Sequence, residues 1–216
     1  MKKNVYSLIL SEEVVDAIDR QAYQKGTNRS ALINQILAEY VSYTTPSMHR
    51  AQIFGGLQEA LSGVPLKHLK TSDTFFVVAS SLSYKYNPTV KYSVELYMQE
   101  GLLGEFKATL RTQNATLMEM MAEFCLLWHS LEEKVIGEVK DRMEPARYSR
   151  VFSLRREQGL SSALSAKELG ELIADYIRAF DTALKEYFRL VYNPSLAQMA
   201  VEAVYRQYIT QTSKIM

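Results

Sequence analysis

The pattern of hydrophobic and polar positions changes its period several times along the chain. Residues 4–10, Asn-Val-Tyr-Ser-Leu-Ile-Leu, alternate and are rich in β-branched and aromatic side chains, which is typical of a strand. Ser11 and the two glutamates after it mark a helix start. That helix is amphipathic and closes at Lys25-Gly26, and Asn28 is placed to cap a second amphipathic helix. The sequence therefore predicts one strand and two short helices within residues 1–43.

A module of this size cannot be stable alone. Its single strand has two unpaired backbone edges, and a chain well under about 60 residues buries too little apolar surface. Two copies would solve both problems, with their strands paired antiparallel across a twofold axis. The sequence thus predicts a homodimer.

Two stretches of the module carry a family resemblance. Residues 7–15, Ser-Leu-Ile-Leu-Ser-Glu-Glu-Val-Val, and residues 25–33, Lys-Gly-Thr-Asn-Arg-Ser-Ala-Leu-Ile, resemble the ribbon-helix-helix superfamily of Arc/MetJ/CopG-like DNA-binding regulators. The resemblance implies a homodimer whose two-stranded ribbon enters the major groove of double-stranded DNA. It also implies a phosphate bound at the start of the second helix, at Asn28, Arg29 and Ser30. These three residues form a polar helix N-terminus with one cation, which by itself suits an anion.

The side of the strand that would face the groove is unusual for this superfamily. If Tyr6, Leu8 and Leu10 face the helices, the alternation places four other side chains toward DNA bases. These are Lys3, Val5, Ser7 and Ile9. Valine and isoleucine form no hydrogen bonds and can recognise only thymine methyl groups, so polar contacts are left to Lys3 and Ser7.

The module has no net charge and would attract DNA only weakly by electrostatics. Within residues 1–47 the cations equal the acids, namely Lys2, Lys3, Arg20, Lys25 and Arg29 against Glu12, Glu13, Asp16, Asp19 and Glu39. Affinity for DNA normally depends on the neutralisation of phosphates, so the module predicts modest binding unless another region contributes. The alternative is a module that only dimerises.

The rest of the chain predicts a linker and a larger domain. Residues 44–72 contain small polar residues, a proline and a pattern for one short helix, and we assign them as the linker. From residue 73 the period becomes alternating. Phe75–Tyr86, Val90–Met98 and Gly104–Arg111 predict three strands of an antiparallel meander.

Three long helical patterns follow the predicted strands. The first runs from Asn114 to Asp141, the second opens with a capping box at Ser165, and the third begins at Pro194. The predicted fold class is therefore α+β, mostly α with a small antiparallel sheet. A ribbon-helix-helix is followed by a three-stranded meander packed with three long helices in a domain over residues 73–216.

One segment is rich in arginine. It lies between Lys140 and Glu157 and contains Arg147, Arg150, Arg155 and Arg156. It could supply the phosphate-binding charge that the N-terminal module lacks, or it could be a solvated connector whose arginines pair with nearby acids. We favour the connector, because charge runs are most often solvated surface.

Composition narrows the class of protein. The chain has 216 residues, with 25 lysines and arginines against 24 acids, which is typical of a globular protein. It contains no apolar run of about 18 residues and no signal-peptide pattern, so we expect no membrane association and a cytoplasmic location. Cys125 is the single cysteine, which excludes an intrachain disulfide.

The sequence shows no arrangement that suits catalysis. The three histidines are scattered, and no glycine-rich loop marks a nucleotide site. Cys125 and His129 would share a helix face, but their apolar neighbours indicate a core thiol rather than half of a metal site. We therefore predict no catalytic residues, no metal and no cofactor, and a protein that is not an enzyme.

Together these patterns favour a homodimeric ribbon-helix-helix transcriptional regulator, a repressor in the simplest case, that binds double-stranded DNA. Its C-terminal domain would bind a protein or a small-molecule effector. The alternative is a structural or interaction protein in which the N-terminal module serves only to dimerise. Val5 and Ile9, which cannot hydrogen-bond to bases, are the residues that favour this alternative.

Overall fold

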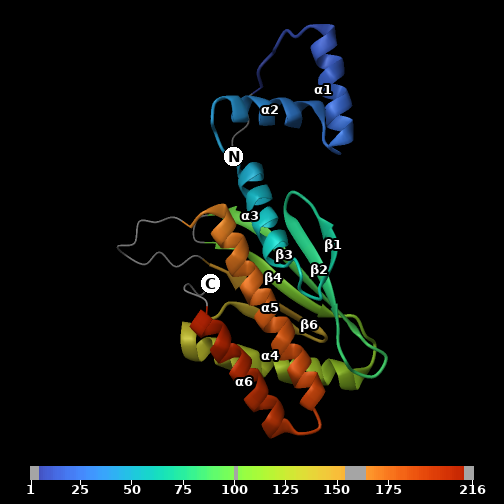
Figure 1. Ribbon diagram of the computed structural model, residues 1–216, viewed down its shortest axis with the longest axis vertical. Coiled ribbons are helices and arrows are strands. Elements are labelled where there is room, and N and C mark those ends of the chain that lie inside the picture. Colours follow the sequence, from blue (N-terminus) through green and yellow to red (C-terminus); the bar gives the residue numbers. More distant parts are fainter. Residues whose placement is uncertain (1–4, 100–101, 154–163, 212–216) are drawn as a thin grey trace. The chain divides into compact units, whose positions relative to one another are not determined.

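The structure is a computed structural model that describes residues 5–99, 102–153 and 164–211 (Figure 1). The chain divides into two compact units, Met1–Met48 and His49–Met216. The boundary lies slightly beyond Tyr43, where the sequence pattern placed the end of the first module.

The first unit contains the two predicted helices, α1 (Glu12–Gln24) and α2 (Arg29–Tyr40). Ser11 occupies the N-cap position of α1, and the turn between the helices passes through Gly26 at a φ of 62°, where glycine has no steric cost. Residues 5–11 form no strand in the single chain. A strand requires a pairing partner, and the predicted ribbon would form only between two copies of the chain. The ribbon therefore stays a prediction.

The remaining elements belong to the second unit, except that the first three residues of α3 lie in the first unit. They are α3 (Pro46–Ala60), β1 (Lys67–Thr71), β2 (Phe75–Ser81), β3 (Thr89–Gln99), β4 (Leu102–Leu110), α4 (Ala115–Ile136), β5 (Asp141–Glu144), β6 (Arg147–Phe152), α5 (Ala166–Leu190) and α6 (Pro194–Gln211).

The predicted three-stranded meander is wrong, because the sheet has six antiparallel strands in the order β1-β2-β3-β4-β6-β5. The three predicted strands correspond to β2, β3 and β4. Strand β1 was missed because all five of its residues are exposed, so it has no alternation of buried and exposed positions. The hairpin of β5 and β6 was missed because its charges resemble a solvated loop.

Both edges of the sheet carry features that oppose pairing with another strand. The β1 edge carries Lys67 and Lys70, and its pairing with β2 is irregular between His68 and Lys70. The β5 edge is only four residues long. Lysines, irregular pairing and short length are the usual means by which exposed edges avoid further strands.

The helices begin where the sequence signals placed them. Asn114 caps α4, and Ser165 and Glu168 form the predicted capping box of α5. The end of α4 differs from the prediction, because the chain turns at Gly137 with a φ of 83° and Asp141 already belongs to β5. The predicted run to Asp141 therefore contains a helix, a turn and the start of a strand.

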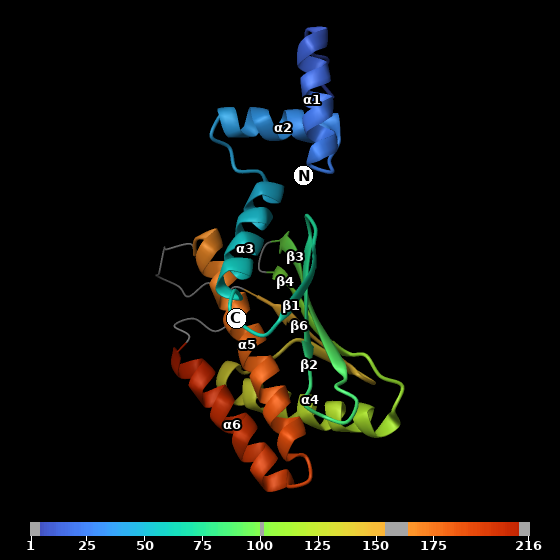
Figure 2. The same ribbon diagram turned by 45° about the vertical axis from the view of Figure 1, so that its right-hand side comes forward.

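The helices of the second unit pack on one face of the sheet (Figure 2). Along β3 the buried side chains are Val90, Tyr92, Val94 and Leu96, which confirms the predicted alternation of this strand. Phe180 of α5 lies at the centre of this core, with ring contacts to Phe106 of β4, Phe124 of α4 and Tyr148 of β6. One continuous aromatic cluster therefore joins the sheet to α4 and α5.

Helix α3, which the sequence analysis placed in a linker, is part of this core. Its Ile53, Phe54 and Leu57 are buried. It crosses α5 at Gly170, where an added Cβ would lie 2.5 Å from the Ile53 carbonyl oxygen and 2.6 Å from the Leu57 amide nitrogen. Backbones this close leave room only for glycine, so the later turns of α3 are fixed against α5.

The described part of the arginine-rich segment forms the hairpin of β5 and β6 and is not a solvated connector. Arg150 is 3% exposed and its Nε lies 2.8 Å from Oε1 of Glu132, which is 1% exposed. Tyr148 and Tyr176 donate hydrogen bonds to the same carboxylate at 3.0 and 3.2 Å. Burial raises the pKa of Glu132, although Arg150 and the two hydroxyls act in the opposite direction.

This geometry corrects the proposed accessory phosphate site at Arg150, because its guanidinium is enclosed by the core. It also lies over the rings of Phe152 and Tyr176. Arg147 is exposed, and its Nη1 lies 3.5 Å from Oε2 of Glu144. Arg155 and Arg156 lie outside the described residues. Of the described arginines in this set, Arg147 alone is accessible to solvent.

We predict that Arg150→Met lowers the free energy of unfolding of the second unit by about 3–5 kcal/mol, because it leaves Glu132 buried without its cation. Arg147→Met is the matched control on the same strand, and an exposed pair contributes about 0–1 kcal/mol. Urea unfolding of the full chain would measure both. Equal losses in the two variants would contradict a structural role for the buried pair.

Candidate nucleic-acid interface

The four residues predicted to face DNA bases lie in the segment before α1. Val5 and Ile9 are almost fully exposed, at 98% and 103%, and Ser7 is also exposed. Lys3 lies outside the described residues. The structure of the single chain places none of the three described side chains against another element of the first unit, so they are free to contact a ligand.

The opposite side of this segment is exposed as well. Tyr6, Leu8 and Leu10, which were predicted to face the helices, are 80%, 60% and 40% exposed. The single chain therefore does not separate an inner face from an outer face. A second copy that pairs with the segment would fix which side is covered.

The first unit as a whole leaves most of its apolar surface uncovered. Among its described hydrophobic residues only Ala22, Leu32 and Ala38 are buried. The exposed large ones are Val5, Tyr6, Leu8, Ile9, Leu10, Val14, Tyr23, Ile36, Leu37, Tyr40, Val41 and Tyr43. So many exposed large apolar side chains in so short a unit indicate a surface that a partner covers.

The start of α2 has the geometry of an anion site. The Asn28 side-chain oxygen accepts a hydrogen bond from the Ala31 backbone N–H at 2.9 Å, which confirms Asn28 as the N-cap. The first N–H groups of a helix have no acceptor within the helix, so those of Arg29 and Ser30 can meet a ligand. Both residues are exposed. The positive end of the helix dipole lies at the same place.

The Arg29 side chain is engaged within the first unit. Its Nε donates to Oδ1 of Asp19 at 2.6 Å, and its Nη2 donates to the other carboxylate oxygen. The hydrogen bond from Arg29 lowers the pKa of Asp19, and that to Asp19 raises the pKa of Arg29. This two-point contact joins α1 to α2. A phosphate would compete with Asp19 for the guanidinium.

Sequence reasoning missed this ion pair. Asp19 and Arg29 are ten residues apart on different helices. Only the sharp turn at Gly26 brings them together. An opposite-charge pair that spans a predicted glycine turn is a signal that could have found it.

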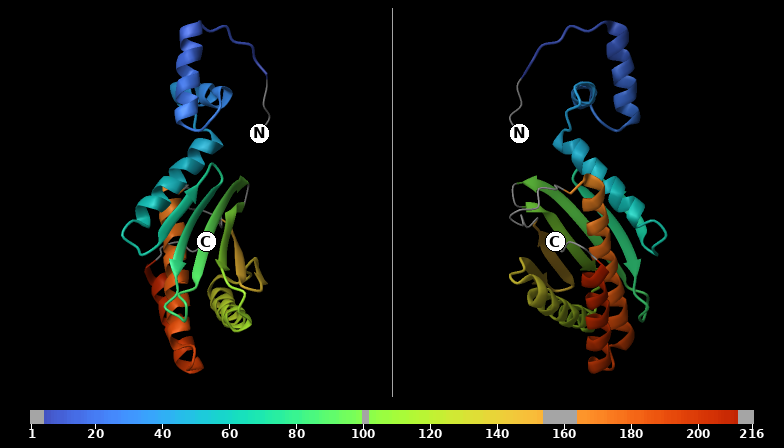
Figure 3. Two further views of the ribbon diagram at one scale, coloured as in Figure 1. Left: turned by 90° about the vertical axis from the view of Figure 1, so that its right-hand side faces the viewer. Right: turned by 60° about the vertical axis from the view of Figure 1, so that its left-hand side comes forward.

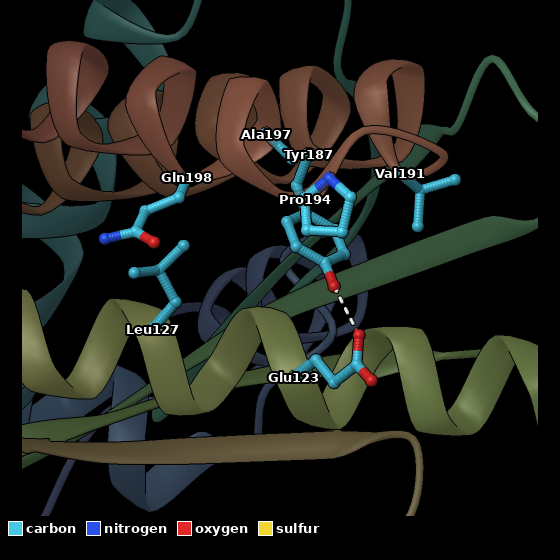
Figure 4. A pocket seen from close by; sticks show the side chains of 7 residues that line it. All are labelled: Glu123, Leu127, Tyr187, Val191, Pro194, Ala197 and Gln198. Carbon is cyan, nitrogen blue, oxygen red and sulfur yellow. Dashed lines mark hydrogen bonds between the residues drawn. The ribbon is translucent and has the colours of Figure 1, made fainter.

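The second unit contains a small pocket between α4 and the turn that joins α5 to α6 (Figure 4). It is lined by Glu123, Leu127, Tyr187, Val191, Pro194, Ala197 and Gln198. Its volume is about 190 Å³, whereas sites for small molecules usually measure about 300–1,000 Å³. The Tyr187 hydroxyl donates to the Glu123 carboxylate at 2.7 Å across it. This pocket is therefore smaller than a usual small-molecule site.

Cys125 and His129 lie on one face of α4 but do not form a reactive pair. Cys125 is 2% exposed, and burial raises the pKa of its thiol. His129 instead contacts Asp141, with Nδ1 at 2.8 Å from the carboxylate. Within the described residues, no group of three histidine, cysteine or acidic side chains is placed to hold a metal ion. Cys125 is therefore a core thiol, as its apolar neighbours predicted.

Comparisons with protein-family models, with curated proteins and with solved structures find no match for this chain. In the described part of the chain, the helices are all too short or too polar to cross a membrane.

We predict that Asn28→Ala destabilises the start of α2 by about 1 kcal/mol, because it removes the acceptor for the Ala31 N–H. The control is Thr27→Ala, since the Thr27 side chain makes no hydrogen bond among the described residues. Hydrogen exchange of the α2 amides would show the difference. Equal protection in the two variants would contradict the capping role.

Proposed function

We propose that the protein is a homodimeric ribbon-helix-helix DNA-binding regulator, and in the simplest case a repressor. The observation that carries this proposal is the first unit, in which two helices, the second capped by Asn28, accompany a large set of exposed apolar side chains. A second copy is the partner that would cover those side chains and pair the segment before α1.

In the proposed dimer, residues 5–10 of the two copies pair antiparallel. Tyr6, Leu8 and Leu10 would then lie against the helices, and the alternation of the strand would turn Val5, Ser7 and Ile9 outward together with Lys3. The outward side would enter the major groove. Ser7 and Lys3 would contact polar groups, and Val5 and Ile9 would contact thymine methyl groups.

The start of α2 would anchor the dimer on the DNA backbone. The N–H groups of Arg29 and Ser30, fixed by the Asn28 cap, would hold a phosphate oxygen. The Arg29 side chain would contribute only if the phosphate displaced Asp19. We therefore assign the anchoring to the backbone first and to the guanidinium second.

In this proposal the second unit would block access of other proteins to the DNA that the first unit binds. Its six-stranded sheet and four helices form a folded body far larger than a dimerisation tail. Bound beside a promoter, such a body would obstruct other proteins, which is the simplest physical route to repression. A protein partner or an effector would modulate it.

A second candidate function is a dimerisation module without DNA binding. Three observations favour it: the apolar Val5 and Ile9 on the predicted groove side, the neutral charge of residues 1–47, and the pairing of Arg29 with Asp19. Under this candidate the second unit would carry the whole function. The two candidates differ in whether the dimer binds DNA at all.

Two neighbouring residues provide the test, because the proposed register gives them opposite roles. We predict that Leu8→Asp prevents dimerisation, since it places a carboxylate in the apolar interface. We predict that Ile9→Asp leaves the dimer intact and weakens DNA binding, since it places a negative charge against phosphates and bases. Sedimentation would measure the mass, and fluorescence anisotropy with genomic duplex fragments would measure binding.

The outcomes separate the candidates. A dimeric wild-type protein that binds no duplex DNA at low salt would favour the dimerisation module. If Ile9→Asp prevented dimerisation while Leu8→Asp did not, the register would be reversed. A wild-type protein that stays monomeric would contradict both.

A further inference from the structure

The face of the sheet opposite the helices has an orderly pattern of charge. Strand pairing places residues from all six strands in cross-strand rows, and side chains in one row share a face. One row consists of Lys67, Ala79, Lys91, Thr109, Arg147 and Glu144. The next consists of Lys70, Val77, Ser93, Lys107, Ser149 and Arg142. We refer to these two rows as the basic rows.

The basic rows contain six cations and one acid, Glu144. The acids Glu95 and Glu105 lie one row further, beside Phe75 and Val151. The surplus is specific to this face, because the whole chain has a net charge of only +1. The fold therefore places on one face cations that come from five different strands.

Half of these cations have no carboxylate partner among the described residues. Lys107 contacts Glu105 at 2.8 Å, and Arg142 and Arg147 share Glu144. Lys67, Lys70 and Lys91 form no ion pair within the part of the chain that the structure describes; Lys70 lies over the Phe75 ring. All three are exposed. They lie on β1 and β3, so the uncompensated charge is concentrated at one side of the sheet.

No described helix of the second unit covers this face (Figure 3). The helices pack on the opposite side, where Tyr92 and Tyr148 are fully buried. Six strands about 4.8 Å apart give a face roughly 24 Å wide. It is broad and accessible to a large ligand.

We propose that the basic rows are a second DNA-binding surface, which contacts the phosphate backbone of double-stranded DNA without reading its sequence. Duplex DNA carries one negative charge per about 1.7 Å of its axis, so a face of this width meets many phosphates. Lysine side chains form such contacts independently of base sequence.

The chemistry of this surface favours a nucleic acid over an acidic protein. Protein interfaces are depleted in lysine and contain aromatic or aliphatic side chains at their centre. The basic rows are rich in lysine, and their non-cationic positions hold Ala79, Val77, small hydroxyl residues and Glu144. No large apolar side chain stands between the cations to anchor a protein partner.

This inference rests on the proposed function, because it supplies the charge that the neutral first unit lacks. Sequence-independent contacts from the second unit would add affinity, while the ribbon would select the site. The two surfaces are separable by mutation, since the ribbon and the basic rows share no residue.

The experiment measures binding of the full-length protein to a random-sequence duplex by anisotropy, between about 50 and 200 mM salt. Lys67→Glu with Lys91→Glu reverses two cations of the basic rows. Lys134→Glu with Arg206→Glu makes the same change of net charge on α4 and α6, where both residues are exposed. Lys67→Arg with Lys91→Arg keeps the charge, and thermal unfolding of each variant checks the fold.

We expect the reversal in the basic rows to reduce the slope of log K against log salt by about two, since each phosphate contact contributes about 0.9. The double variant Lys134→Glu with Arg206→Glu and the double variant Lys67→Arg with Lys91→Arg should both keep the wild-type slope. Equal slopes for the two glutamate pairs would overturn the inference. So would a wild-type protein that does not bind the duplex.

The ribbon variant Ile9→Asp separates this result from the proposed function. If Ile9→Asp loses binding and the lysine reversal does not, the proposed function stands and the second surface is wrong. If the lysine reversal loses binding and Ile9→Asp does not, the basic rows bind DNA and the ribbon does not read it.

Discussion

The first unit is governed by one constraint: it folds into two helices that cannot bury their own apolar side chains. Three buried hydrophobic residues among its described positions are too few to offset the conformational entropy of an ordered chain of this length. Everything proposed for this unit follows from that deficit, since a second copy would supply the missing surface and would pair the segment before α1. The second unit has no such deficit, because its aromatic cluster joins sheet and helices around Phe180.

Local signals predicted the helices well, and the reasons are physical. Asn28, Asn114 and Ser165 each accept a backbone hydrogen bond at a helix start, and such caps act over three residues. The strand β3 was predictable for a similar reason, because one of its faces is buried and the other is half exposed. In these elements the local pattern and the tertiary environment agree.

The elements that the sequence did not reveal depend on distant partners. Arg150 looks like a surface charge in the sequence, yet it pairs with Glu132 of α4 in the core, so the β5–β6 hairpin was mistaken for a connector. The basic rows were equally hidden, because they form only when six strands align. For Val5, Ser7 and Ile9 the reason is different: in the proposed dimer their environment would depend on a second chain.

The edges of the sheet bear on how many copies can assemble. The β1 edge has lysines and an irregular pairing, and the β5 edge has only four residues, so neither offers a regular template to another strand. Extension of the sheet from molecule to molecule, the route to fibres, is disfavoured at both ends. In the proposed dimer, stoichiometry would be set by the first unit, because twofold pairing of its apolar surfaces would cover them in both copies and close after two chains. Assembly would then end at a finite particle instead of an open polymer.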